Sequence, residues 1–303
     1  MRQNTSMVNA AVRRADPFPF ITKQEIEGRE RSANKAKQKA STPIQMFLPG
    51  MDEFMRAMPN LLARSSLFAP IARGHRKMHG GTVLVSRKDG VLEYWGEQLD
   101  EADADILLQL MFEARQAALG QPITINRAAF LRAMNRSTGK HDYEWLHRRM
   151  KVLTAATLII EAKKPDGSTK YRIGDTKAFH ILAGFDYDAN VEAYTYTYTL
   201  DPQWRVLFDN REYALIDWQK RLLIGRGQDM AKALQRLVAT SSNAEQQHAL
   251  DWLKEKMQYA SPMRKFKNAL NSAMRELERL KIIAKGRIEF STKGKEQAAW
   301  KKL

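Results

Sequence analysis

A series of predicted elements between residues 99 and 173 constrains the fold of this chain more than any other feature. The first is a helix over residues 99 to 119, because apolar residues recur at helical spacing and acidic residues crowd its first turns. A short strand over residues 122 to 125 follows, and Asn126 then caps a second helix. The region therefore begins with a helix, a strand and another helix.

A turn, a third helix and a hairpin complete this region. Residues 135 to 140, NRSTGK, have the polar side chains and the glycine of a turn, and a helix is predicted over residues 141 to 154. Its inward positions are Tyr143, Leu146, Met150 and Leu153, and its outward positions are His141, Glu144, Arg148 and Lys151. Strands over residues 157 to 161 and 170 to 173 flank a turn at residues 165 to 167. This is the order of a winged helix, a variant of the helix-turn-helix.

The same order of elements is predicted again towards the C-terminus. Helices are expected over residues 226 to 239, 244 to 257 and 261 to 285, and a strand over residues 287 to 290. Since the two regions match in the order of their elements, we expect an α+β fold with two tandem winged-helix domains. The predicted divisions are a disordered basic tail at 1–43, a linker at 44–60 and winged-helix domains at 61–205 and 206–303.

The predicted helix over residues 261 to 285 has two different faces. The apolar face consists of Met263, Phe266, Leu270, Met274, Leu277 and Leu280, and the polar face of Arg264, Asn268, Asn271 and Arg275. The segment holds seven Lys and Arg residues against two Glu residues. Arg and Asn can make bidentate contacts with guanine and adenine edges in the major groove of DNA. The helix is therefore either a DNA-reading helix or a surface helix whose basic face is solvated.

The charge balance of the whole chain favours a polyanionic partner. The 303 residues include 50 Lys and Arg against 34 Asp and Glu, so the formal net charge is +16. No apolar run is long enough to cross a bilayer, and the N-terminal stretch has no continuous apolar segment typical of a secretory signal. The chain has no cysteine, which excludes disulfides and thiolate zinc sites. We expect a cytoplasmic protein with no membrane partner.

The motifs of common enzymes are not found in this sequence. Gly139-Lys140 and Gly294-Lys295 lack the earlier glycine and the following Ser or Thr that a phosphate-binding P-loop requires. His75 and His79 lie in a glycine-rich stretch without the glutamate of a zinc-binding helix. We therefore expect a protein that is not an enzyme and that has no cofactor and no metal site.

Residues 191 to 199, VEAYTYTYT, alternate tyrosine and threonine, which is typical of a strand. Tyr194, Tyr196 and Tyr198 share one face of that strand. These rings could stack on nucleic-acid bases, but packing against a neighbouring helix is the more frequent use of such a face.

Two segments ahead of the first domain are open to two interpretations each. The tail over residues 1 to 43 holds nine Lys and Arg against four Asp and Glu, so it either holds phosphates loosely or acts as a solubilising arm. Residues 44 to 49, IQMFLP, form a short apolar segment after this polar tail. That segment is either a docking peptide for a partner or a hydrophobic anchor that packs on its own domain.

The chain has three stretches, at residues 54–68, 120–155 and 207–221, that resemble the TrfA family of plasmid replication initiators. Residues 54 to 60, FMRAMPN, together with residues 63 to 68, ARSSLF, resemble the opening signature of the family. Residues 120 to 155 resemble its first winged helix. The stretch from Leu207 to Arg221 resembles its central segment. Beyond this region the resemblance is loose.

The resemblance implies an initiator that binds iterons, which are directly repeated sites in the double-stranded DNA of a plasmid origin. It also implies opening of an AT-rich region and recruitment of host DnaA, the DnaB helicase and the sliding clamp. In the family, monomers bind iterons and initiate, and homodimers restrain copy number. The family's clamp-docking peptide precedes the signature, at the place of Gln45, Met46 and Leu48 here, and Pro49 replaces its terminal aromatic residue.

The residues expected to contact DNA come from both predicted winged helices. They are Arg136, Ser137, Lys140, His141 and Arg148 in the first, and Arg264, Lys265, Lys267, Asn268, Asn271 and Arg275 in the second. Arg279 and Lys281, near the end of the basic helix, are expected to face water or the DNA backbone. The alternatives are a winged-helix transcriptional repressor that binds its operator as a dimer, and an enzyme acting on DNA.

Overall fold

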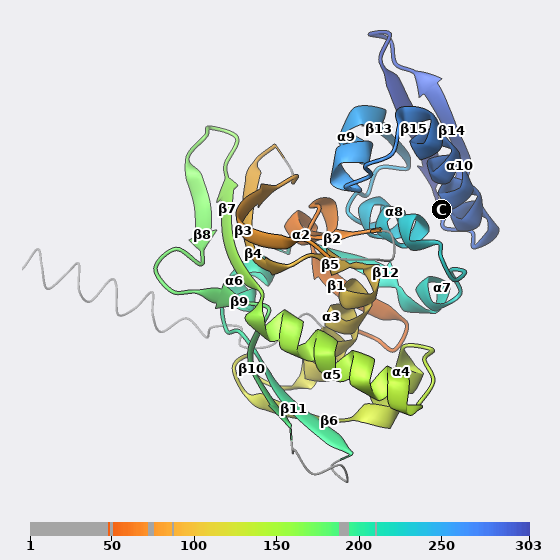
Figure 1. The fold of residues 1–303 in the computed structure, drawn as a ribbon. Coiled ribbons are helices and arrows are strands. Elements are labelled where there is room, and N and C mark those ends of the chain that lie inside the picture. The colour runs from red at the N-terminus through yellow and green to blue at the C-terminus, as the bar shows by residue number, and fades with distance from the viewer. Residues whose placement is uncertain (1–47, 49–50, 72–75, 87, 188–193, 210) are drawn as a thin grey trace, which may run out of the picture. The chain divides into compact units, whose positions relative to one another are not determined.

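The series of elements predicted over residues 99 to 173 is present in the structure (Figure 1). The structure is a computed structural model, and it describes residues 48, 51–71, 76–86, 88–187, 194–209 and 211–303. The predicted tail at residues 1–43 and the proposed docking residues Gln45 and Met46 lie outside this part of the chain. Residues 45–303 form one compact unit.

The first winged-helix unit follows the expected order of helix, strand, helix, helix and hairpin. Its elements are α3 (Glu101–Glu113), β6 (Pro122–Asn126), α4 (Arg127–Ala133), α5 (Lys140–Ala155), β7 (Thr157–Lys163) and β8 (Thr169–Ile173), and a 3₁₀ turn (Ala114–Gln116) follows α3. Asp100 caps α3 through the backbone N–H groups of Ala102 and Asp103. The side-chain oxygen of Asn126 accepts the N–H of Ala129 at 2.9 Å, so the predicted cap of α4 is confirmed.

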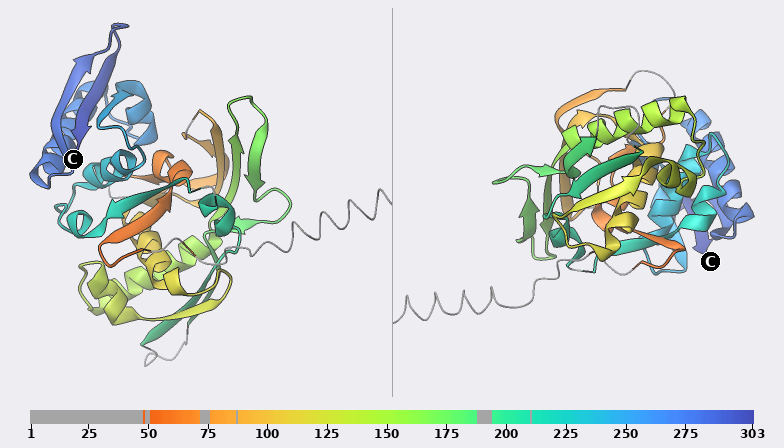
Figure 2. Two further views of the ribbon diagram at one scale, coloured as in Figure 1. Left: turned by 180° about the vertical axis from the view of Figure 1, so that it is seen from behind. Right: turned by 90° about the horizontal axis from the view of Figure 1, so that it is seen from below.

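Two sheets extend this first unit. The wing strands β7 and β8 continue a sheet of order β3-β4-β7-β8, formed with β3 (Met78–Leu84) and β4 (Gly90–Glu97), and β9 (Phe179–His180) also pairs with β7. The other sheet has the order β10-β11-β6 and includes β10 (Leu182–Tyr187) and β11 (Thr195–Leu200). Helix α5 covers one face of the β10-β11-β6 sheet (Figure 1, Figure 2).

The tyrosine ladder on β11 packs inside the protein. Tyr196 is 4% exposed and lies beside His147 of α5, and Tyr198 is fully buried with its hydroxyl donating to the carbonyl of Leu110 at 2.5 Å. The packing interpretation is therefore confirmed for these two rings. Tyr194, just before the strand, is exposed.

The signature that resembles the TrfA family forms a buried strand. Strand β1 (Met55–Pro59) pairs antiparallel with β12 (Tyr213–Asp217), and Ala57 and Met58 are buried in the core. The sequence placed residues 44–60 in a linker, and for residues 55–59 that prediction is wrong. The strand is fixed because β12 supplies its hydrogen-bonding partner and the core covers its side chains.

Short elements complete the region around this strand pair. They are α2 (Asn60–Arg64), β2 (Phe68–Ala69), which pairs in parallel with β5 (Leu99–Asp100), α6 (Trp204–Phe208) and α7 (Trp218–Leu222). Leu48 is 3% exposed and belongs to the same core.

The second winged-helix unit repeats the order of the first. Its elements are α8 (Asp229–Ala239), β13 (Glu245–Ala249), α9 (Leu250–Lys256), α10 (Met263–Arg279), β14 (Ile283–Phe290) and β15 (Glu296–Lys302). The strands form a sheet of order β13-β15-β14, and α10 packs along α8 and β14. Helix α8 begins at Asp229 rather than at residue 226.

The prediction of one helix over residues 244 to 257 is wrong in its first half. Residues 245–249 are strand β13, and only residues 250–256 are helical. The inward positions of the strand are Gln246 and His248, so the apolar alternation that marks a strand is missing. Gln246 is buried because its side chain accepts the indole N–H of Trp300 at 3.0 Å and donates to the carbonyl of Val238 at 3.1 Å.

Helix α10 is shorter than predicted at both ends. Pro262 occupies the capping position without a side-chain hydrogen bond, so the helix begins at Met263 rather than at residue 261. At the other end the helix stops at Arg279, because Lys281 has a positive φ of 52° that breaks the helix. Ile283 then begins β14, a strand that the sequence predicted only from residue 287.

The buried apolar residues fall into two clusters, one for each winged-helix unit. The first extends from Leu48 to Trp218 and the second from Ile224 to Trp300. The change between them lies after the expected boundary at residue 206, because β12 belongs to the first cluster through its pairing with β1.

Buried ion pairs join the two clusters. Arg221 and Arg236 both bind the carboxylate of Glu101 on α3, and all three side chains are fully buried. Asp105, one turn further along α3, binds Arg221 at 2.5 Å and Lys232 at 2.6 Å. Helices α7 and α8 are therefore fastened to α3 by charge-assisted hydrogen bonds.

Candidate nucleic-acid interface

The exposed face of α10 carries four of the six residues of this helix that were predicted to contact DNA. Phe266, Leu270 and Leu277 bury the other face of the helix in the second cluster, which fixes its orientation. The exposed residues of the helix are Arg264, Lys265, Asn268, Ser272, Arg275 and Arg279. Among the residues that the structure describes, none has a hydrogen bond or ion pair with the side chains of Arg264, Lys265, Asn268 or Arg275. The helix thus presents a row of cationic and amide groups that are available for a ligand.

The two remaining candidates on α10 are less available. Lys267 forms an ion pair with Glu296 of β15, and Asn271 is half-buried. The Lys267 pair fastens the helix to the wing. The other four candidates on α10 are the ones whose side chains have no partner among the described residues.

The end of α10 is held by its own charges. The guanidinium of Arg279 donates to the carboxylate of Glu276 at 2.8 Å and to the carbonyl oxygen of Leu223 at 2.9 Å. The hydrogen bond from Arg279 is the main cause that lowers the pKa of Glu276 to about 2. Arg279 is exposed, as the sequence predicted, and it also bonds to a carboxylate and a protein carbonyl.

Helix α5 also exposes the predicted residues of the first unit. Lys140, His141, Glu144 and Arg148 are exposed, and Lys140 lies 3.9 Å from Glu144. The outward face predicted for this helix is confirmed. The row is less basic than that of α10, because Glu144 lies within it.

The turn before α5 is fixed by contacts with the helix. Arg136 lies over the ring of Trp145, 3.5 Å from its centroid, and pairs with Asp142 at 3.3 Å. The hydroxyl of Ser137 also bonds to Asp142. The hydrogen bond from Ser137 is the main cause that holds the pKa of Asp142 below its usual value. Arg136 and Ser137 are therefore preorganised at the N-terminal end of α5.

An arginine that the sequence reasoning missed anchors α5 to the rest of the unit. Arg149 is 3% exposed, and its guanidinium binds the carboxylate of Asp103 on α3 at 2.5 and 2.8 Å. It also pairs with Glu97 at the end of β4. The sequence could have indicated this role, because Arg149 lies beside the inward positions Leu146 and Met150. A buried arginine needs acidic partners.

The wings were not predicted as DNA contacts, although both carry basic residues. The tip of the second wing, between β14 and β15, exposes Lys293 and Lys295, and Phe290 is 72% exposed beside them. The tip of the first wing exposes Lys163 and Lys164. Lysine is one of the residue types that contact DNA phosphates in protein–DNA complexes.

The described residues offer neither a metal-binding cluster nor a membrane-spanning helix. No group of three or more His, Asp or Glu residues within these ranges is placed to hold a metal ion. No helix in the described part of the chain is long and apolar enough to span a lipid bilayer.

The structure defines a mixed α+β protein with two winged-helix-like units, each of which exposes its third helix. Its fold is similar to a crystal structure of domains 2 and 3 of RctB, with a TM-score of 0.51 and 12% identity over 81% of this chain and 98% of that chain. A second structure of RctB domains 2–3 matches with a TM-score of 0.49 and 12% identity, over 78% of this chain and 95% of the other.

At this level of identity the likeness concerns the fold alone. A scan of protein-family models finds none that matches the chain, and a search of curated proteins finds no match.

Proposed function

We propose that this chain is a DNA replication initiator that binds directly repeated sites at a plasmid origin through its two winged-helix units. The observation that carries the proposal is the exposed face of α10, where Arg264, Asn268 and Arg275 have no partner among the described residues. Helix α5 presents a second such face in the same chain. Two different reading helices in one chain suit an asymmetric site, and a direct repeat is a series of asymmetric sites.

Two further observations support this class of protein. The RctB domains that share the fold are replication initiator domains. In addition, two of the stretches that resemble the TrfA family pair with each other, since β1 lies in the signature and β12 in the central segment. The signature residues therefore act together as one strand pair in this protein, rather than as separate matches.

In the proposed complex, some residues position the protein on the DNA backbone and others read the base sequence. Lysines such as Lys265, Lys293 and Lys295 contact phosphates, which gives an affinity that falls with salt concentration. The Arg and Asn residues of α10 contact base edges, and each good bidentate contact contributes about 1–3 kcal/mol of discrimination against the wrong base. Catalysis is not part of the proposal.

The recruitment of host proteins belongs to the same proposal. The family resemblance suggests DnaA, the DnaB helicase and the sliding clamp, with monomers on the repeats and homodimers off DNA. Docking to the clamp through Gln45, Met46 and Leu48 requires a side chain of Leu48 that the clamp can reach. In the described structure Leu48 is buried in the first cluster. That step requires Leu48 to leave the core. In the described structure Leu48 is a hydrophobic anchor of its own domain.

Selection from a random pool of double-stranded DNA tests the proposed function. The full chain is used to enrich bound duplexes, which are sequenced and compared with the DNA beside the gene. An asymmetric motif that recurs there as direct repeats, and a footprint of one protein copy for each repeat, support an initiator. A palindromic motif covered by a dimer identifies a repressor instead. Failure to enrich any sequence contradicts both.

A further inference from the structure

The segment between α7 and α8 is fastened to the reading helix α10. The backbone N–H of Gly225 donates to the carboxylate of Glu276 at 2.8 Å, and the carbonyl oxygen of Leu223 accepts from Arg279 at 2.9 Å. Glu276 is itself held by two hydrogen bonds from Arg279, each of 2.8 Å. This segment therefore has a defined position relative to the C-terminal end of α10.

Arg226 stands at the tip of this segment between two glycines. It is exposed, and no described residue forms a hydrogen bond or ion pair with its side chain. Gly227 has a φ of +80°, and a Cβ placed there would meet nothing within 4 Å. The tip is thus narrow and open, and its backbone conformation is one that glycine adopts without strain. A free arginine on a narrow, anchored loop is suited to contact a ligand outside the protein.

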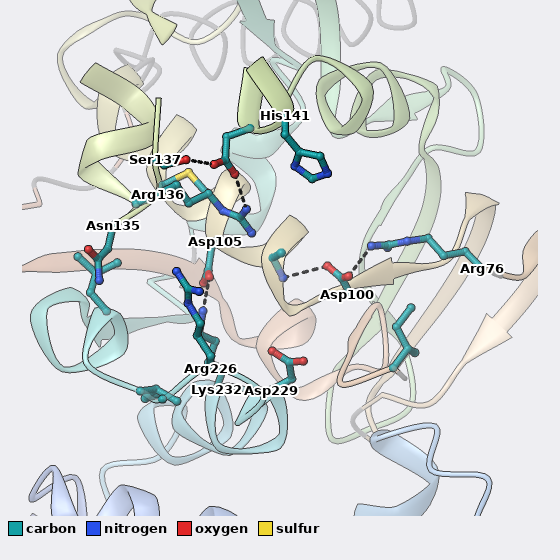
Figure 3. Close-up of a pocket in the computed structure, with 18 residues that line it drawn as sticks. Arg76, Asp100, Asp105, Asn135, Arg136, Ser137, His141, Arg226, Asp229 and Lys232 are labelled. Atoms are coloured by element: carbon teal, nitrogen blue, oxygen red, sulfur yellow. Dashed lines mark hydrogen bonds and ion pairs between the residues drawn. The ribbon is translucent and has the colours of Figure 1, made fainter. Parts of the chain in front are cut away.

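The same loop faces the first reading helix across a cavity of about 950 Å³ (Figure 3). Arg226 lines this cavity together with Arg136, Ser137 and His141, which belong to the turn and first residues of α5. The loop of Arg226 is therefore bonded to one reading helix and shares a cavity with the N-terminal end of the other. It lies between the two.

The interior of the cavity is not suited to an anion, because it contains carboxylates. Asp100, Asp105 and Asp142 line it and are already paired with Arg76, Lys232 and Arg136 respectively, whereas Asp229 is unpaired among the described residues. Phosphate would be repelled from the interior. Among the described lining residues, Arg226 is the exposed arginine without a carboxylate partner, so its charge remains available to a ligand outside the cavity.

A duplex bound by both reading helices must pass this loop. When two helices of one chain enter successive major grooves on one face of DNA, about 34 Å apart, the minor groove between them faces the protein. A narrow minor groove of A·T base pairs has an enhanced negative potential that attracts arginine. A loop that lies between the helices is the segment placed to enter it.

We propose that Arg226 is a further DNA-binding residue, which enters the minor groove between the two major-groove contacts and favours A·T pairs there. Glu276 is the positioning residue that holds the loop through Gly225. This inference rests on the proposed function, since it requires DNA that spans both helices. It goes beyond that function, because it assigns base preference to a segment outside both helix-turn-helix motifs.

The experiment uses a duplex selected from the random pool by the full-length wild-type chain. The base pairs between its two protected major-groove segments are then made all A·T, all G·C or all I·C, where I·C keeps the minor-groove pattern of A·T. Affinity is measured at several salt concentrations for wild type, Arg226→Ala and Glu276→Ala. The matched control is Arg205→Ala, which removes one positive charge from α6, a helix that packs on Phe179 of β9.

We expect wild type to prefer the A·T and I·C duplexes to the G·C duplex. Arg226→Ala should bind the A·T duplex about tenfold more weakly, lose this preference, and reduce the slope of log K against log salt by about 0.9. Glu276→Ala should weaken binding but keep the slope, because the charge remains and only the loop is released. Arg205→Ala should leave the preference and the slope as in wild type.

Two results contradict this inference and are distinct from failure of the proposed function. One is that Arg226→Ala keeps wild-type affinity and preference; the other is that it loses affinity equally on A·T and G·C duplexes. If wild type enriches no sequence at all, the proposed function itself fails. Equal melting temperatures for wild type and Arg226→Ala establish that the variant is folded.

Discussion

The side-chain amine of Lys256 donates a hydrogen bond to the carbonyl oxygen of Ser65 across 3.1 Å, and both residues are fully buried. Lys256 ends α9 in the second winged-helix unit, whereas Ser65 follows α2 in the first cluster. The bond therefore joins the two units beside the ion pairs of Glu101. Burial, with a smaller contribution from Arg236, lowers the pKa of Lys256 to about 7.

The first prediction concerns the stability of the protein at alkaline pH. The pKa of Lys256 is lower in the folded chain than its ordinary value of 10.5, so between pH 7 and 10 the unfolded chain binds more protons at this residue. This residue therefore makes the free energy of unfolding rise with pH across that range. In Lys256→Met the free energy of unfolding should therefore increase less between pH 7 and pH 9.5 than in wild type. Urea unfolding at the two pH values measures this difference.

Lys254→Met is the control, because Lys254 lies on the same helix and is partly exposed. That variant should retain the wild-type dependence on pH. An equal rise in Lys256→Met and wild type would show that the amine is not buried in solution.

The second prediction concerns the ion pairs between the clusters. Glu101→Gln removes the charge that Arg221 and Arg236 share, and it leaves two buried guanidiniums short of a partner. The free energy of unfolding should fall by about 3 kcal/mol or more. Glu144→Gln, which breaks only the exposed pair with Lys140, should change it by less than about 0.5 kcal/mol. Similar small losses for both variants would contradict the proposed role of Glu101 in joining the units.

The order of elements in the first winged-helix unit could be predicted because each element has a local signal. The Asn126 cap and the apolar positions of α5 depend only on neighbours within a few residues. The outward row of α5 followed from the same spacing. Local patterns of this kind are sufficient to place a helix and to orient its faces.

Strands β1 and β13 could not be predicted, because their signals lie far away in the sequence. The hydrogen-bonding partner of β1 is β12, more than a hundred and fifty positions later, and a short segment does not show such pairing. The inward residues of β13 are polar, and only Trp300 makes the burial of Gln246 favourable. Arg226 could not be predicted as a site for a similar reason. Its position depends on the hydrogen bond between its loop and α10, which is distant in the sequence.

The third prediction separates base reading from phosphate contact on α10. Arg264→Ala and Asn268→Ala should reduce affinity for a selected duplex by about tenfold and affinity for random DNA much less. Lys265→Ala should weaken binding to both by a similar factor. Affinities of the three variants are measured on both duplexes at one salt concentration. Equal losses on the two duplexes for all three variants would exclude this assignment.

The fourth prediction concerns the second wing, which exposes Lys293 and Lys295 at its tip. If these lysines contact phosphates, the double alanine variant should bind selected and random duplexes more weakly by the same factor. The slope of log K against log salt should fall by about 1.8, because each lost phosphate contact removes about 0.9. Lys301→Ala, an exposed lysine at the other end of β15, is the control and should keep the wild-type slope. A loss confined to the selected duplex would instead place the wing among the base-reading segments, and an unchanged slope would remove it from the interface.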